Sequence, residues 1–127
     1  MLILDFDHGR PIYLQIIDYI KKQIITRNLK IGDKVPSQRE LAQQLKVNPN
    51  TVQRAYREME NMQLAETIRG QGTFIVKRGE LLKELQGEMA GTLLKNFILE
   101  MQSLGYDDQE ILGLVEKYQQ DLKEEIK

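Results

Sequence analysis

Apolar residues recur every three or four positions along most of this chain, which is the spacing of amphipathic helices. The first run predicts a helix from Pro11 to about Asn28, because proline is favoured at the first helical position. Its apolar residues are Ile12, Tyr13, Ile16, Ile17, Ile20, Ile24 and Ile25. A turn over residues 29–36 follows, with glycine and proline in it. Ahead of this helix, MLILDF is typical of a short strand or a packing arm.

Two short helices come next, joined by a three-residue bridge. The first spans residues 37–45, and Ser37 with Glu40 forms a capping-box pattern at its start. The second spans residues 49–62, with Asn48 as its expected N-cap. One face of the second helix is apolar and consists of Val52, Ala55, Tyr56, Met59 and Met62. Its other face carries amides and cations, so we interpret the pair as a helix-turn-helix whose second helix recognises DNA.

The hydrophobic pattern changes after this recognition helix. Residues 64–68 and 73–76 are short β-favouring runs, and the sequence between them is Arg-Gly-Gln-Gly. A β-hairpin that directly follows a helix-turn-helix is the wing of a winged helix. We therefore expect residues 1–78 to form a winged helix-turn-helix DNA-binding domain, mainly α-helical with a small β-hairpin.

From Gly79 onward the pattern is helical throughout. Gly105 is the expected end of one helix, and Asp107 with Glu110 is a candidate capping box for another, which predicts a two-helix antiparallel hairpin in residues 79–127. Its apolar surface is wider than two helices can bury against each other, so we expect a second copy to cover it. The candidate dimerisation residues are Leu85, Met89, Leu93, Phe97, Met101, Ile111, Val115, Tyr118 and Leu122.

Charge divides the chain in the same way as the hydrophobic pattern does. The 127 residues carry a net charge of −1. Residues 1–78 contain 13 Lys and Arg against 8 Asp and Glu, which gives +5, whereas residues 79–127 contain 5 against 11, which gives −6. The basic domain can attract the phosphates of nucleic acid, whereas the acidic segment is expected to have a different role.

Several classes of function are disfavoured by composition. There are no cysteines and only one histidine, His8, so we expect no metal site and no catalytic constellation, and hence no enzyme. There is no apolar run of membrane-spanning length and no secretion signal, so we expect a cytoplasmic protein without a membrane partner. No polar cluster indicates a cofactor or a small-molecule effector, and any effector stays unknown.

The segment that carries these motifs is GDKVPSQRELAQQLKVNPNTVQRAYREMENMQLAETIRGQGTFI. It resembles the DNA-binding domain of the GntR family of bacterial transcription regulators, over about Pro11 to Val76. The short helical segment after it resembles the YtrA subfamily. This resemblance implies a homodimeric repressor, in a subfamily often encoded with the transporter genes that it controls. The symmetry of a twofold dimer in turn requires an inverted-repeat operator in double-stranded DNA.

The resemblance also places the DNA contacts. By position it assigns Arg39 in the first helix of the motif, four polar residues around the recognition helix, and Arg69 with Gly70 at the wing tip. Together with the polar face and the rest of the tip, the candidates are Ser37, Arg39, Asn48, Asn50, Thr51, Gln53, Arg54, Arg57, Arg69, Gly70, Gln71 and Gly72. Many relatives have arginine where this chain has Pro49 and Gln53. Asn and Gln pair with adenine, so we expect a half-site that depends less on guanine, unless a remaining arginine reaches one.

Each assignment has a simpler structural alternative. Arg54 and Arg57 could be solvated or paired with nearby glutamates, and Ser37 could act as a cap alone. The GxxxG spacing of Gly87 and Gly91 fits either a close helix crossing or a weak point in the helix. The rival function is a winged-helix module that binds protein and no DNA, and the positive charge of the N-terminal domain favours DNA over this rival.

Overall fold

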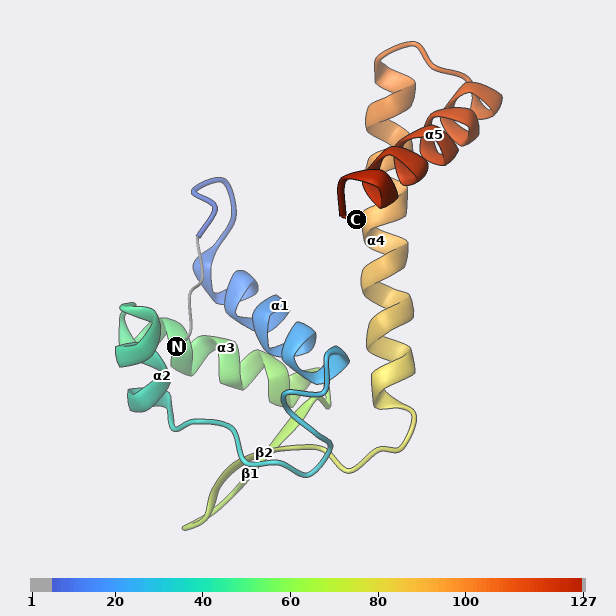
Figure 1. The fold of residues 1–127 in the computed structure, drawn as a ribbon. Helices are drawn as coiled ribbons and strands as arrows, with labels where there is room; N and C mark the ends of the chain where they lie inside the picture. Colours follow the sequence, from blue (N-terminus) through green and yellow to red (C-terminus); the bar gives the residue numbers. More distant parts are fainter. Residues whose placement is uncertain (1–5, 127) are drawn as a thin grey trace. The chain divides into compact units, whose positions relative to one another are not determined.

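The computed structural model describes residues 6–126, so most of the strand or arm predicted for MLILDF lies outside the described residues. The described residues form five helices and two strands (Figure 1). In chain order they are α1 (Ile12–Ile25), α2 (Gln38–Leu45), α3 (Pro49–Asn61), β1 (Ala65–Ile68), β2 (Gly72–Ile75), α4 (Leu81–Ser103) and α5 (Asp108–Ile126). This order confirms the predicted fold class. Within residues 6–126, none of the helices combines the length and apolar character needed to cross a lipid bilayer.

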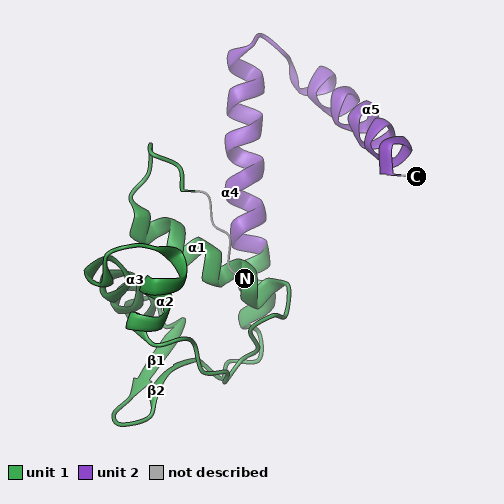
Figure 2. Ribbon diagram, turned by 60° about the vertical axis from the view of Figure 1, so that its left-hand side comes forward, with its two compact units in different colours: residues 1–86 green, residues 87–127 purple. Residues whose placement is uncertain are grey.

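The chain divides into two compact units, residues 1–86 and 87–127 (Figure 2). We predicted the boundary at Gly79, but the division lies later, inside α4. The reason is that Leu81 and Leu85 are buried in the core of unit 1, with exposed fractions of 1% and 5%. Leu85 was a candidate dimerisation residue; its burial removes it from any surface that a second copy could cover.

The core of unit 1 is built around α3, which packs against α1, α2 and β1. Four isoleucines of α1 are buried there, as the helical spacing predicted: Ile16, Ile17, Ile20 and Ile24. Helix α1 ends at Ile25, earlier than predicted, because Arg27 adopts a left-handed conformation with φ of 65°. Met62 is a second difference, because it caps α3 and is 42% exposed instead of completing the apolar stripe.

The wing is more than a two-stranded hairpin. Strands β1 and β2 pair antiparallel, with Ala65 opposite Ile75 and Ile68 opposite Gly72. On the other edge of β2, the segment before α2 adds further backbone hydrogen bonds: Val35 N–H donates to the Thr73 carbonyl at 2.9 Å, and Ile75 N–H donates to the Asp33 carbonyl at 2.8 Å. The sequence predicted only a turn here, and the structure instead fixes this turn against the wing.

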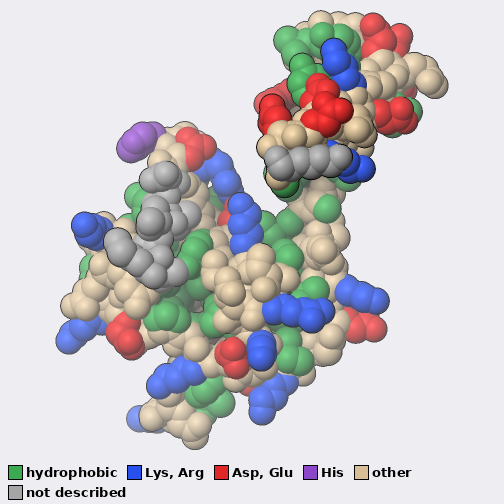
Figure 3. Space-filling view, in the orientation of Figure 1, with side chains coloured by type: hydrophobic (Ala, Val, Ile, Leu, Met, Phe, Trp, Pro, Cys, Tyr) green, Lys and Arg blue, Asp and Glu red, His purple; other side chains and the backbone are tan. Residues whose placement is uncertain are grey.

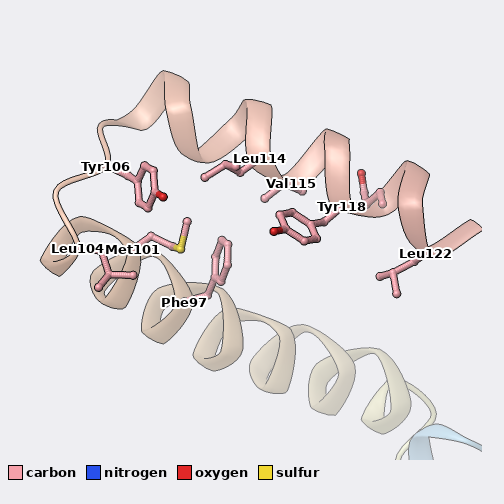
Figure 4. A pocket seen from close by; sticks show the side chains of 9 residues that line it. Phe97, Met101, Leu104, Tyr106, Leu114, Val115, Tyr118 and Leu122 are labelled. Carbon is pink, nitrogen blue, oxygen red and sulfur yellow. The ribbon is translucent and has the colours of Figure 1, made fainter.

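Unit 2 holds the rest of α4 and all of α5. The loop between them is capped as predicted: Gly105 has φ of 93°, and Asp107 and Glu110 exchange side-chain to backbone hydrogen bonds of 2.8 and 3.1 Å. An open apolar groove of about 480 Å³ lies between the two helices (Figure 4). It is lined by Phe97, Met101, Leu104, Tyr106, Leu114, Val115, Tyr118, Gln119 and Leu122.

Candidate nucleic-acid interface

Helix α2 begins with the predicted capping box. The Glu40 N–H donates to Ser37 Oγ at 3.1 Å, and the Ser37 N–H donates to Glu40 Oε1 at 3.2 Å. The hydrogen bonds from Ser37 to its carboxylate lower the pKa of Glu40, because they favour the charged form. Both side chains are exposed, as is Arg39 in the same first turn. Ser37 is therefore a cap, and its place at an exposed helix N-terminus is compatible with a nearby phosphate.

Helix α3 begins as its sequence predicted. The Asn50 N–H donates to Asn48 Oδ1 at 2.8 Å, and Pro49 occupies the first turn, where no intrahelical donor is needed. The inner face of the helix is fully buried and consists of Val52, Ala55, Tyr56 and Met59. The polar residues that were predicted to contact DNA are left on the outer face.

Tyr56 joins the recognition helix to the segment before α2. Its ring is 1% exposed, and its hydroxyl donates to the Pro36 carbonyl at 2.6 Å. Burial, and then the negative charge of Glu40, raise the pKa of Tyr56. Tyr56 is therefore a core residue, as its register predicted, and not a platform on which a base could stack.

Arg54 contacts the aromatic ring of Tyr13, a residue that helical spacing had placed on the apolar face of the first helix. Its guanidinium carbon lies 3.9 Å from the centroid of the Tyr13 ring, a cation–π contact between α3 and α1. Among the described residues, neither Arg54 nor Arg57 pairs with Glu58 or Glu60. Periodicity could not have revealed the contact, because it shows which face Tyr13 occupies and not what lies across from it.

A shallow depression surrounds this contact at the start of the recognition helix. Its lining residues are Pro11, Ile12, Tyr13, Asn48, Asn50, Thr51 and Arg54. Four of them are predicted DNA contacts, and the structure brings these four together. Amide, hydroxyl and guanidinium groups in one concave surface can donate hydrogen bonds to phosphate or base oxygens.

The wing tip is a glycine-containing turn that exposes a cation. The Gln71 N–H donates to the Ile68 carbonyl at 2.9 Å, and Gly70 has φ of 79°, which suits glycine. Arg69 is exposed at this turn and makes no ion pair among the described residues. One pair back from the turn, where Thr67 lies opposite Thr73, the wing is tied to α3 because the Thr67 hydroxyl donates to Glu60 at 2.5 Å.

The candidate DNA-contacting residues all lie in unit 1. All are exposed apart from Thr51 and Gly72, which are half-buried. Figure 3 shows Lys and Arg side chains around the wing and the helices of unit 1, whereas Asp and Glu side chains gather on unit 2. No group of three or more His, Asp or Glu side chains in residues 6–126 could hold a metal ion.

Comparison with known proteins shows which family this chain resembles. Residues 12–75 match the model of the bacterial regulatory proteins, gntR family. The chain is 47% identical over 107 residues to the uncharacterized HTH-type transcriptional regulator YhcF of Bacillus subtilis, covering 84% of this chain and 88% of that protein. It is 36% identical over 124 residues to the HTH-type transcriptional repressor YtrA of the same organism, covering 97% and 95%.

Solved structures of similar chains support the same family. A GntR family transcriptional regulator from Listeria monocytogenes is 42% identical, with a TM-score of 0.81 over 88% of this chain and 98% of that one. The DNA-binding domain of AraR in complex with operator ORR3 is 26% identical, with a TM-score of 0.52 over 60% and 92%. These relatives are regulators and not enzymes, as predicted. The chain therefore belongs to the gntR family of bacterial regulatory proteins and carries its winged helix-turn-helix.

Proposed function

We propose that this protein is a sequence-specific transcriptional repressor that binds an inverted-repeat operator as a homodimer. The observation that carries the proposal is the outer face of α3, where exposed amides and cations share one unit with an exposed cationic wing tip. An α-helix of this kind fits the major groove, and a wing beside it can follow the backbone. The operator complex of AraR, a structural neighbour, supports the same mode of binding here.

Base reading is assigned to Gln53 and Asn50. Both are exposed on the first turns of α3, and an amide side chain can bind adenine N6 and N7 with two hydrogen bonds. Arg39, Arg54, Arg57 and Arg69 are proposed to bind phosphates or a remaining guanine. Ser37, Thr51 and the backbone of the wing glycines complete the contacts with the DNA backbone.

Sequence preference tests this assignment. Gln53→Ala should relax the preferred base at its own position, by about 1–3 kcal/mol of discrimination, and leave the rest of the site unchanged. The measurement is the binding of a panel of single-base operator variants, with Gln109→Ala on α5 as the matched control. A variant that binds more weakly but keeps the full sequence preference would refute the base-reading role.

The dimer is proposed from unit 2. Its helices expose more apolar surface than a monomer ordinarily leaves in water: Leu93 is 69% exposed, Leu94 is 59% exposed, and Tyr118 and Leu122 border the open groove. A second copy of the same unit provides an apolar partner of matching chemistry. The proposed interface comprises Met89, Leu93, Phe97, Met101, Val115, Tyr118 and Leu122; Ile111 is left out because it is already buried within the chain.

The regulated genes are proposed from the same family. The YtrA-like arrangement supports control of a transporter operon, and a repressor acts where the chromosome lies, in the cytoplasm. The rival function is a winged-helix module that binds protein without DNA. A gel shift with genomic fragments and heparin as competitor separates the two, because the rival binds no fragment once heparin is present.

A further inference from the structure

The residue in question is Lys34, which belongs to none of the sites described above. It lies in the segment between α1 and α2, and its backbone bridges antiparallel to Phe74 of β2. The neighbouring hydrogen bond from Val35 to the Thr73 carbonyl holds this segment in place. The backbone of Lys34 is therefore fixed to the wing and is not part of a loose loop.

The side chain of Lys34 crosses the wing over Gly72. A Cβ built on Gly72 would lie 2.6 Å from Lys34 Cε and 3.4 Å from its Nζ, so the lysine occupies the space that any side chain at position 72 would need. The backbone of Gly72 has φ of 124°, which also suits glycine. The methylene groups of Lys34 pack on the backbone of Gly72, which carries no side chain, and this packing restrains the lysine side chain. Because the backbone of Lys34 lies opposite Phe74 and its side chain reaches Gly72, the ammonium group points along β2 toward the wing tip.

The ammonium group of Lys34 has hydrogen-bonding capacity to spare. Lys34 is exposed and forms no ion pair or hydrogen bond among the described residues. The carboxylate that it influences, Glu40, is engaged by Ser37 in the capping box. A lysine ammonium has three donors, and phosphate oxygens are the acceptors that a duplex presents along its surface.

We propose that Lys34 binds a phosphate of the operator backbone beside the wing, and that the bare backbone of Gly72 is what lets it do so. The inference rests on the proposed DNA-binding function. It extends the contact surface from the wing tip, where Arg69 lies, to the segment that leads into α2. One cation thus joins the two elements that flank the recognition helix.

The salt dependence of DNA binding tests this role on the full chain. The variants are Lys34→Gln, Lys34→Arg, Gly72→Ala, and Lys123→Gln in α5 as the matched control. Each lost phosphate contact lowers the slope of log affinity against log salt by about 0.9, so Lys34→Gln should lower it by about 1.8 in a dimer. Gly72→Ala should lower the slope in the same way, and Lys34→Arg should retain it. The preferred base sequence should stay unchanged in all four.

Three outcomes are decisive. An unchanged slope in Lys34→Gln, with wild-type protein bound to DNA, overturns the role of Lys34 alone. A lowered slope in the Lys123→Gln control overturns it too, because the effect would then be general electrostatics. If wild-type protein binds no duplex, the proposed function itself fails. Circular dichroism of each variant shows that the slopes compare folded proteins.

Discussion

The hydroxyl group of Tyr56 is the clearest single-residue link between the core and the DNA-facing side of unit 1. It lies on the buried face of α3 and donates to the Pro36 carbonyl, one residue before the cap of α2. Helix α3 is therefore joined to the segment that leads into α2 by one partly buried hydrogen bond, and to α2 itself by packing. Removing the hydroxyl leaves that carbonyl without its partner.

Tyr56→Phe should lower the free energy of unfolding by about 0.5–1.5 kcal/mol, the usual net contribution of one hydrogen bond. Urea denaturation followed by circular dichroism measures it. The control is Tyr106→Phe, because the Tyr106 hydroxyl makes no hydrogen bond among the described residues. Equal stability of the wild type and Tyr56→Phe would contradict the link.

The contact between Tyr13 and Arg54 is testable without DNA. A partly exposed cation–π pair contributes about 0.5–1 kcal/mol. A double-mutant cycle of Tyr13→Leu and Arg54→Ala should therefore show a coupling of that size in the free energy of unfolding. Strictly additive losses would mean that the ring does not hold the arginine in solution.

At the scale of elements, each helix of the motif begins at a side-chain cap. The caps of α2 and α3 satisfy backbone donors that would otherwise point into solvent. For α2, the ionised carboxylate of Glu40 also closes the capping box, which lowers the pKa of Glu40 below its ordinary value of 4.5. Folding therefore favours the charged form of Glu40, and we expect the stability of the start of α2 to depend on pH.

Since folding lowers this pKa, Glu40 stabilises the protein above its ordinary pKa and loses that contribution as the pH falls through the folded value. Wild type should therefore be more stable than Glu40→Gln at about pH 7, and the difference should be smaller at a pH well below 4.5. Urea midpoints at the two pH values measure this. A difference that does not depend on pH would rule out ionisation as the cause.

Elements with local causes could be predicted from the sequence, and those with distant causes could not. The capping boxes, the glycine at the end of α4 and the hairpin all follow from neighbouring residues. The pairing of Lys34 with Phe74 joins residues 40 positions apart, and no local pattern encodes it. The contact of Tyr13 with Arg54 is hidden for the same reason. Leu85 was assigned to the dimer interface because helical spacing shows which residues share an apolar face. It does not show which core buries each of them.

At the scale of the whole molecule, the two units carry opposite net charge, and we assign a different role to each. The basic unit carries the predicted DNA contacts, and the acidic unit exposes an apolar surface that we assign to a second copy. Pairing two DNA-binding units doubles the phosphate contacts and requires a twofold operator. We therefore expect tight operator binding to require dimerisation.

Leu93→Glu should convert the protein from dimer to monomer, because a carboxylate buried in an apolar interface is strongly unfavourable. Lys95→Glu places the same charge two residues away and should leave the dimer intact. Sedimentation equilibrium measures both masses, and operator affinity should fall only for Leu93→Glu. A monomeric wild type would contradict the proposed interface.

The most direct test of the central claim is selection of genomic DNA fragments by the purified protein at moderate salt, with heparin present and with sequencing of the bound fraction. The enriched fragments should share an inverted repeat whose half-site centres lie about one helical turn apart. Bound fragments without any shared sequence, or no bound fragments at all, would contradict it.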